Sequence, residues 1–383
     1  MLPKFIKPRF FDALSNMTGR YVQPEPYHKA EGLVKKVYDQ VIDEFFINAP
    51  MTTHAVSREM LAGVWMAERE IVLTDNHLTR EDKEALGVTI SQVNSCAYCE
   101  DLMNSVVYGA NELELAEQMR YHKQDEITDE RTRLLHAWAQ NVYDQDAEIL
   151  YQPPFTHDEA PEVIGVAMML SYFNRYAQVF FSGSPLATPI SSTTLKSILY
   201  RLTGVELRES VLRRLRPGRS IGLLGPADLP QDLQWAAGNS TISAAISRWA
   251  SAVEKAASAH VPQRVREVVK NEIKSWQGAP MGLSRAWLTP KTVGLNQSNA
   301  AAVRLALLTA LSPEQMSDDI VDAYKEHYND TALVVTVSWS AFMASKRVTG
   351  WLADKTGYFE QHQYAVARPK WRPPSSAGEA SIV

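Results

Sequence analysis

The residues best suited to chemistry are the two cysteines of the chain, Cys96 and Cys99, which form a single C-x-x-C pair. A cysteine acts as nucleophile or reductant in its thiolate form, and a free thiol titrates at about pH 8.5, so a working site is expected to lower that pKa. Three-residue spacing early in a helix places both sulfurs on one face, close enough to form a disulfide. Asn94 and Ser95 precede the pair and are good N-cap residues, so we expect a helix to begin here with its dipole favouring the anion. The pattern predicts a redox dithiol.

Other uses of a cysteine pair fit this sequence less well. A disulfide-stapled secreted domain needs more cysteines, and a four-ligand zinc site needs a second thiol pair or paired histidines, which the sequence lacks. A c-type haem attachment needs a histidine directly after the second cysteine, where Glu100 stands. Neither of the glycine-rich nucleotide-binding motifs occurs in its required context. We therefore expect no metal and no bound cofactor.

Composition and charge narrow the class of protein. A chain of 383 residues with 45% hydrophobic and 22% charged residues is typical of a globular protein with two or three domains, or with one duplicated unit. The net charge of -5 argues against a nucleic-acid partner. No apolar run reaches the roughly 18 residues that span a bilayer, so we expect no membrane partner. The N-terminus lacks the apolar segment of a secretory signal, which favours a cytoplasmic location.

The elements that must position the cysteines are predicted to be helices. Apolar residues recur at i, i+3, i+4 and i+7 in five segments, and alternating β-branched runs bounded by hairpin turns are missing. The segments are 32–46, 57–73, 80–92, 131–143 and 162–181. The fold class is therefore predicted to be all-α.

The two halves of the chain resemble each other. Glu84 precedes Cys96 by twelve residues, and Glu267 precedes Ala279 by the same spacing, but the second half has no thiols. The aromatic stretch VIGVAMMLSYFNRY is matched later by LVVTVSWSAFMASKR. We predict two tandem repeats packed as a pseudo-dimer, with a structural second repeat. Trp276 and Met281, near the missing thiols, are interpreted as core replacements.

Domain boundaries follow from composition. Proline and glycine cluster after about residue 216, next to the basic stretch 208–219, which we interpret as a solvated connector. We expect an N-terminal arm (1–35), a first repeat with the C-x-x-C (36–205), a linker (206–234), a second repeat without cysteines (235–360) and a flexible tail (361–383).

The stretch EALGVTISQVNSCAYCEDLMNSVVYGA resembles the core motif of the carboxymuconolactone decarboxylase / alkylhydroperoxidase D-like (AhpD-like) family. That motif has a glutamate, eleven residues, a C-x-x-C on a helix, and a histidine four residues after the second cysteine. Glu84, Cys96 and Cys99 match it, and the resemblance covers about residues 36–185, with a weaker match over 235–355. It implies an AhpD-like helical bundle. Met103 stands where the family has the histidine, so a proton relay through that side chain cannot operate here.

The resemblance also implies roles for the matching residues. Cys99 would attack a hydroperoxide, and Cys96 would resolve the resulting sulfenic acid to a disulfide. Glu84 would act as general base with a pKa raised by burial; its alternative is a solvated carboxylate on a helix surface. Tyr98, between the cysteines, could donate its hydroxyl to a thiolate, and a packing role is an equal alternative.

A different polar group could replace the family histidine, or peroxidase activity could be weak. The candidates are Asn104, Tyr108, His122 and His136. His136 lies on an apolar helix, where a lone histidine is usually a satisfied core residue, and His122 fits an exposed turn. The sequence favours neither histidine.

The leading hypothesis is a dithiol peroxidase or thiol–disulfide oxidoreductase that reduces organic hydroperoxides through the Cys96–Cys99 pair. Its partners would be a small hydroperoxide and a dithiol or protein reductant. The alternatives are a lyase like carboxymuconolactone decarboxylase, without redox chemistry, and a non-catalytic helical scaffold with relic cysteines. The resemblance further implies a homo-oligomer, either dimer or trimer.

Overall fold

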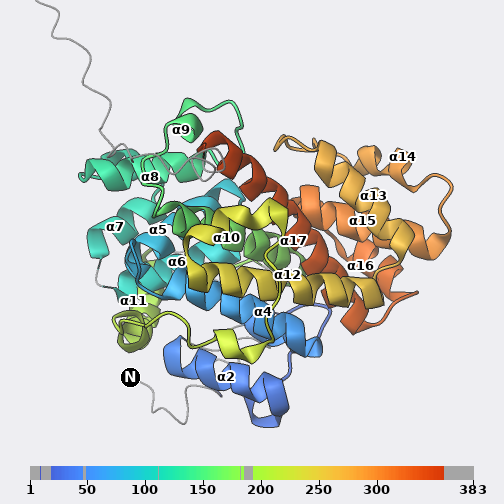
Figure 1. The fold of residues 1–383 in the computed structure, drawn as a ribbon, viewed down its shortest axis with the longest axis horizontal. Helices are drawn as coiled ribbons and strands as arrows, with labels where there is room; N and C mark the ends of the chain where they lie inside the picture. Colours follow the sequence, from blue (N-terminus) through green and yellow to red (C-terminus); the bar gives the residue numbers. More distant parts are fainter. Residues whose placement is uncertain are drawn as a thin grey trace, which may run out of the picture.

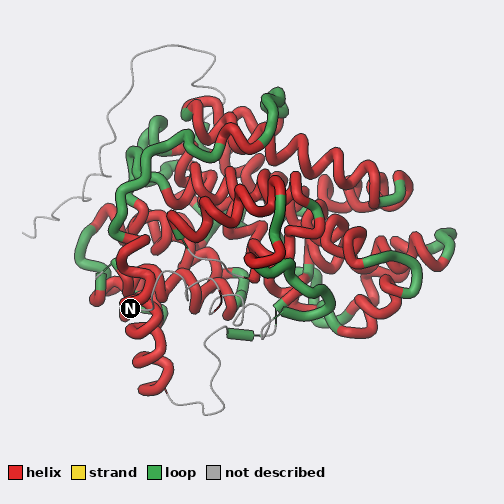
Figure 2. The backbone as a smooth tube through the Cα atoms, turned by 90° about the horizontal axis from the view of Figure 1, so that it is seen from below, coloured by secondary structure: helices red, strands yellow, loops and turns green. Residues whose placement is uncertain are grey.

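Helices make up the regular structure of the computed structural model, which describes residue 9 and residues 19–45, 49–110, 112–181, 183–184 and 193–357 (for 193–197, the backbone only). Within these residues no strand forms, and the single isolated β-bridge joins Gly19 to Phe181 (Figure 2). The all-α prediction is confirmed. The predicted tail, 361–383, lies outside the described residues, and so does part of the predicted arm.

The first half contains eight helices of eight residues or more in the described part of the chain. They are α2 (Gly32–Glu44), α4 (Arg58–Glu68), α5 (Arg80–Val93), α6 (Ala97–Gly109), α7 (Leu113–Arg120), α8 (Glu130–Gln140), α10 (Ala160–Phe180) and α11 (Thr193–Val211). Shorter helices are α3 (Ala49–Thr53) and α9 (Glu148–Tyr151). A single π-helical turn, Arg69–Leu73, continues α4.

The second half is helical in the same way. Its helices are α12 (Ser240–His260), α13 (Gln263–Ser275), the short α14 (Thr289–Thr292), α15 (Gln297–Leu311), α16 (Asp318–Lys325) and α17 (Asp330–Lys355). In Figure 1, α13 to α16 lie at the opposite end of the molecule from α7, α8 and α11. Among the helices described, none has the length and apolar content needed to cross a membrane.

The two halves meet along two helix pairs. The α10 helix packs along α17, and α4 packs along α12, where a Cβ added to Gly63 would lie 3.0 Å from Trp249. Side chains of both halves belong to one continuous apolar core. These pairs join helices at corresponding places in the two predicted repeats, and the duplication itself stays a prediction. The α10 helix is buried on nearly every side, which explains its almost continuous apolar sequence.

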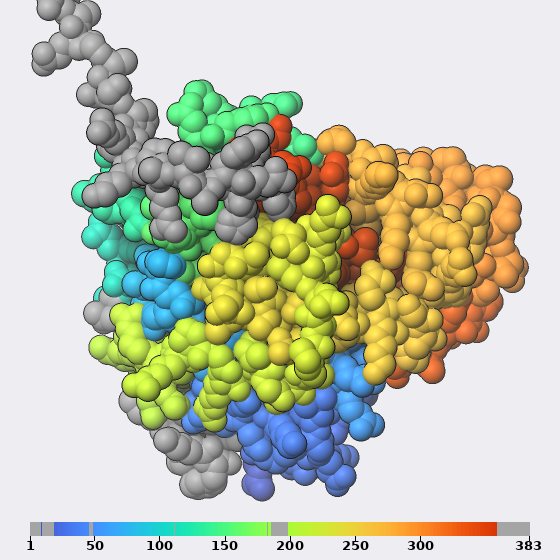
Figure 3. Space-filling view, viewed as in Figure 1, coloured from blue at the N-terminus to red at the C-terminus, as the bar shows by residue number. Residues whose placement is uncertain are grey.

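The segment between α11 and α12 is attached to the first half through buried acids. The carboxylate of Glu70 accepts hydrogen bonds from the amide of Gly218 (2.7 Å) and the hydroxyl of Ser220 (2.7 Å). The half-exposed Arg219 donates to Glu44 at 2.8 Å. This segment and α12 cover much of the face seen in Figure 3. The basic stretch thus combines solvated arginines with a backbone bonded to the core.

A close crossing of α6 and α11 holds the helix that carries the cysteines. Gly109 and Gly204 meet there: a Cβ on Gly109 would lie 2.9 Å from the Gly204 carbonyl oxygen, and one on Gly204 would lie 2.9 Å from the Gly109 nitrogen. Such distances to backbone atoms leave no room for any side chain. Tyr200 of α11 also donates a hydrogen bond to Asp101 of α6. The crossing therefore depends on both glycines.

Replacing Gly204 with alanine should destabilise the protein by about 1–3 kcal/mol, because the two backbones must separate. The matched control is Gly350→Ala on α17, where an added Cβ meets nothing within 4 Å. That change should stabilise by about 0.5–1 kcal/mol through helix propensity. Chemical denaturation of both variants measures the difference. Equal effects of the two substitutions would contradict this account of the crossing.

Candidate functional site

The C-x-x-C pair lies at the start of α6, as predicted, with a different cap. Cys96 itself is the N-cap, and its sulfur accepts a hydrogen bond from the Cys99 amide at 3.4 Å. Ser95 is not the cap, because it adopts a left-handed φ of 52° in the turn that joins α5 to α6. Asn94 ends α5 as its C-cap. The turn therefore brings the sulfur of the first cysteine to the backbone of the second.

Both thiols are buried, and the structure holds them reduced. Cys96 is 2% exposed and Cys99 is 4% exposed. The pKa of Cys99 is raised well above its usual value, chiefly by burial, then by a hydrogen bond with Cys96 and by the charges of Cys96 and Glu68. This is opposite to the direction expected for a working nucleophile. Cys99 therefore needs a nearby base to become a thiolate.

Cys99 faces a small cavity. Its free volume is about 20 Å³, room for about one water molecule. The polar or sulfur-bearing residues on its wall are Met51, Glu68, Tyr98, Cys99 and Met103. The remaining lining is apolar: Phe45, Pro50, Leu102, Leu170 and Phe173. The cavity is thus lined by a thiol and a carboxyl group among mainly apolar side chains.

Glu68 is the site residue that sequence reasoning missed. It is the last residue of α4, is 3% exposed, and its Oε2 atom has no hydrogen-bond partner. Burial raises its pKa to about 8, helped by the charge of Glu84 and opposed by Arg80. One signal was available in the sequence: Glu68 continues the i, i+3, i+4, i+7 stripe that begins at Leu61, where an apolar residue is expected.

Glu84 is buried as well, so the alternative of a solvated surface carboxylate is wrong. It is 1% exposed, and Arg80 one turn earlier donates to it at 3.3 Å. Its pKa is raised, chiefly by burial, with Arg80 opposing. Arg80 also donates to the Ser210 carbonyl at 2.9 Å and lies over the ring of Phe45, 5.0 Å from its centroid. The burial expected of Glu84 is present, and its role as base stays a prediction.

Three of these buried groups form one electrostatic unit. Glu68 and Glu84 carry two potential negative charges, while Arg80 supplies one positive charge. Two unscreened negative charges next to one positive charge are costly in a buried site, and one proton removes the excess. Because Glu68 has the pKa of about 8, it holds that proton at neutral pH.

Tyr98 and Met103 shape the cavity wall. The Tyr98 ring stacks on Phe181 with centroids 4.8 Å apart, and Tyr98 is 6% exposed. It therefore packs and lines the cavity at the same time. Met103 is 5% exposed and lines the same cavity, one turn after Cys99. The wall that would carry the family histidine carries a thioether instead.

A buried histidine that the sequence reasoning did not single out supports the opposite wall. His54 is fully buried; its Nδ1 bonds the Pro50 carbonyl, and its Nε2 lies 2.6 Å from the Tyr172 hydroxyl. Burial lowers its pKa to about 4, so the ring is neutral at physiological pH, donating through Nδ1 and accepting at Nε2. His54 thereby holds Pro50, whose side chain lines the cavity.

The four candidates for a replacement relay do not line this cavity. Asn104 is buried, and Tyr108 donates to Glu117 at 2.6 Å. His136 is buried 2.7 Å from the Thr89 hydroxyl, with a pKa lowered to about 4 by burial, as expected of a core histidine. His122 sits in an exposed turn with a φ of 54°. None of them is among the described residues around the second thiol.

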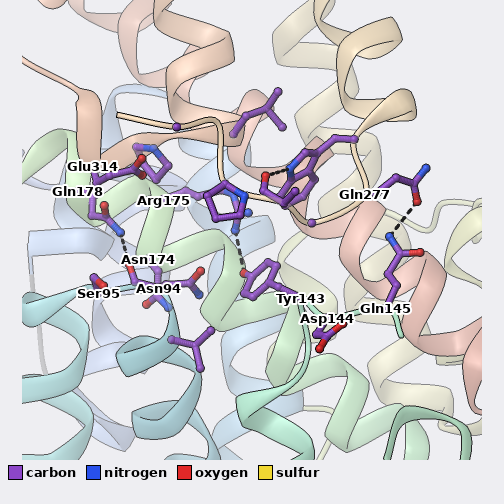
Figure 4. Close-up of a pocket in the computed structure, with 18 of the residues that line it drawn as sticks. Asn94, Ser95, Tyr143, Asp144, Gln145, Asn174, Arg175, Gln178, Gln277 and Glu314 are labelled. Carbon is purple, nitrogen blue, oxygen red and sulfur yellow. Dashed lines mark hydrogen bonds between the residues drawn. The ribbon is translucent and has the colours of Figure 1, made fainter. Parts of the chain in front are cut away.

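A much larger pocket, of about 1010 Å³, lies beside the turn that precedes Cys96 (Figure 4). Arg175 lies within it, donating to the Tyr143 hydroxyl at 3.1 Å and to the Ala310 carbonyl at 2.8 Å. Its guanidinium lies over both Tyr143 (5.6 Å) and Trp276 (5.7 Å). The wall includes Ser95 but neither cysteine, whereas Cys99 lines the small cavity.

The second half has no counterpart of this site. Glu267, at the position corresponding to Glu84, is exposed and lies 3.5 Å from Arg264 on its own helix. Trp276 packs against Trp351 with centroids 5.5 Å apart, and Met281 is partly buried against the core. Both residues have the packing role that was predicted for them.

The fold and site together define an all-α protein with a buried dithiol at a helix start. Comparison with known proteins adds a relative: the chain is 29% identical over 339 residues to alkyl hydroperoxide reductase Rv2159c of Mycobacterium tuberculosis. The match covers 87% of this chain and 94% of the relative, so it includes both halves. No family model matches the chain. The similarity supports the resemblance to the AhpD-like family.

The Glu68→Gln variant should be stabilised at high pH relative to the native chain. The folded pKa of about 8 lies above the ordinary 4.5, so the native chain loses stability as pH rises from about 4.5 to 8, on the order of a few kcal/mol. Glutamine does not titrate, so the difference in Tm should grow across that window and level off above pH 8. Thermal unfolding at pH 5, 7 and 9 measures it. A difference independent of pH would contradict the burial of an ionisable group at this position.

Proposed function

We propose that this protein is a dithiol peroxidase that reduces organic hydroperoxides through Cys96 and Cys99. The observation that carries the proposal is the buried C-x-x-C at the start of α6, with Cys99 open to a cavity that also contains a carboxyl group. The similarity to a protein named alkyl hydroperoxide reductase supports the same reaction class.

The reaction begins at Cys99. Its thiolate attacks the terminal peroxide oxygen; an S–O bond forms, the O–O bond breaks, and the leaving alkoxide takes a proton to become an alcohol. Sulfur is oxidised by two electrons, and Cys99 becomes a sulfenic acid. The Cys96 thiol then attacks that sulfur, forming the disulfide and releasing water. A dithiol, free or on a partner protein, reduces the disulfide and is itself oxidised.

The assignment of the two cysteines agrees with their surroundings. Cys99 lines the cavity and Cys96 does not, so a small peroxide entering it meets Cys99 first. Cys96 is the residue whose sulfur already contacts the Cys99 amide, which places it to resolve the sulfenic acid. The resemblance implies Glu84 as the base; burial raises its pKa, and Arg80 donates a hydrogen bond to its carboxylate.

The cavity wall favours a substrate with an alkyl group. The free volume of about 20 Å³ holds one water, so an organic hydroperoxide enters only if the wall opens. Phe45, Leu170 and Phe173 then offer apolar contact, which stabilises a bound hydrocarbon by about 25 cal/mol for each Å² removed from water. Arg80 is engaged by Glu84 and the Ser210 carbonyl and does not line the cavity. Uncharged organic hydroperoxides should therefore react faster than hydrogen peroxide or hydroperoxides with a charge near the reacting oxygen.

Assembly and location remain predictions of the sequence. A homo-oligomer requires an exposed apolar surface, and Leu283 and Val293 are largely exposed. A solution mass equal to one 42.9 kDa chain would overturn the predicted dimer or trimer.

Mass spectrometry of the reduced protein before and after one equivalent of cumene hydroperoxide tests the reaction. The native chain should rapidly lose the mass of two hydrogens as the disulfide forms. Cys96→Ser should instead gain one oxygen that a sulfenic-acid trap captures, because the resolving thiol is missing. Cys99→Ser should react no faster than an ordinary free thiol.

Two results would overturn the proposal. If the native chain reacts only at the rate of a free thiol, the scaffold alternative is favoured. If Cys99→Ser reacts and Cys96→Ser does not, the roles of the two cysteines are reversed. A lyase would keep its lactone turnover in both serine variants, which separates the decarboxylase-like alternative from the peroxidase.

A further inference from the structure

We infer that Glu68 is the catalytic residue that exchanges the proton of Cys99, in place of the histidine that the AhpD-like motif carries at the position of Met103. The inference rests on the proposed peroxidase function and assigns its missing proton acceptor. The two buried glutamates then have different roles: Glu68 exchanges the proton of the thiol, and Glu84 raises the pKa of Glu68.

Glu68 lies on the wall of the cavity that Cys99 faces. Glu68, Cys99 and Met103 line the same cavity, whereas Glu84 does not. The free volume of about 20 Å³ admits one water, so Glu68 can take the proton directly or through that water. The remaining polar group on the wall is the phenol of Tyr98, a poor proton acceptor because an ordinary phenol titrates near pH 10.

The carboxyl group of Glu68 has no structural partner among the described residues. No hydrogen bond or ion pair holds it in the described part of the chain, and Oε2 is buried. Leaving such a group unpaired destabilises the fold, and an apolar residue on the stripe of Leu61 would avoid that cost. By contrast, the neighbouring Glu70 bonds Ser220 and Gly218. Burying the Glu68 carboxyl group is therefore unfavourable for stability, and no structural contact compensates for it in the described part of the chain.

Glu68 can both accept the proton of Cys99 and return it to the leaving alkoxide. Glu68 as carboxylate takes the proton of the Cys99 thiol, giving a carboxylic acid and a thiolate. After the S–O bond forms and the O–O bond breaks, the same carboxylic acid gives its proton to the leaving alkoxide, and Glu68 is again a carboxylate. With Glu68 as the base, the cycle needs no reactant beyond the hydroperoxide, the two thiols and the dithiol reductant already named.

The titratable and charged groups that face Glu68 come from two helices. Glu84 and Arg80 lie on α5, while Cys99 and Tyr98 lie on α6. Glu84 raises the pKa of Glu68 and Arg80 lowers it. Glu68 therefore loses its proton near pH 8, and its carboxylate can then accept the proton of Cys99.

The test is the pH dependence of two rates in the full-length protein: single-turnover oxidation by cumene hydroperoxide and alkylation of Cys99 by iodoacetamide. Both native rates should rise with an inflection near pH 8. In Glu68→Gln the inflection should move above pH 9, because the buried thiol must ionise alone, and the rates at pH 8 should fall at least tenfold. Circular dichroism confirms that each variant is folded.

Glu84→Gln is the matched control, with the same chemical change one helix away. Removing the Glu84 charge should move the inflection below pH 8, opposite to the shift in Glu68→Gln. If Glu84→Gln abolishes the inflection while Glu68→Gln keeps the native profile, Glu84 is the proton acceptor and the inference is overturned. If neither variant changes the alkylation profile, it is overturned as well.

The two readouts separate this inference from the proposed function. Alkylation needs only a thiolate, so its pH profile tests Glu68 even in a protein that does not reduce peroxides. A native chain that is alkylated with the inflection near pH 8 but resists hydroperoxide would refute the peroxidase and keep the Glu68–Cys99 proton pair.

Discussion

The site depends on two carboxyl groups that are buried beside the guanidinium group of Arg80. Glu68 and Glu84 compete for the charge of Arg80, and Arg80 bonds Glu84. Burial makes a second negative charge expensive, so Glu68 keeps its proton until about pH 8. The raised pKa of Cys99 has the same principal cause. Burial thus raises the pKa of both a carboxyl group and a thiol on the wall of one cavity.

Helix packing produces that burial, and much of it is remote from the cysteines. The glycine contact between Gly109 and Gly204 holds α6 against α11, and α11 also supplies the Ser210 carbonyl that binds Arg80. The α5 helix begins with a capping box, in which the side chains of Thr79 and Asp82 each bond the other's backbone amide. This cap fixes the first turn, which contains Arg80. The same packing that orients the charges also excludes water from them.

The sequence predicted the parts of the site that depend on local pattern. Apolar periodicity indicated the helices, and the three-residue spacing indicated a thiol pair at a helix start. The motif led to Glu84 but could not show which acid faces Cys99, because that depends on how α4 and α5 lie against α6. Glu68 resembled a surface residue in the run Glu68–Arg69–Glu70, although all three are buried. Arg69 is balanced by Glu44 and Glu70, which leaves Glu68 unpaired, and only tertiary contacts reveal this division.

The second half of the chain contributes packing surfaces to a site that lies in the first half. Its Glu267 is solvated and its thiols are missing, yet α12 packs on α4 at Gly63, five residues before Glu68. The α17 helix packs along α10, whose Leu170 and Phe173 form part of the cavity wall. Because burial is the main cause of the raised pKa of Glu68, helices of the second half contribute to that pKa by covering α4 and α10. The second half contains no cysteine, and its helices α12 and α17 cover α4 and α10, which carry Glu68, Leu170 and Phe173 of the wall beside Cys99.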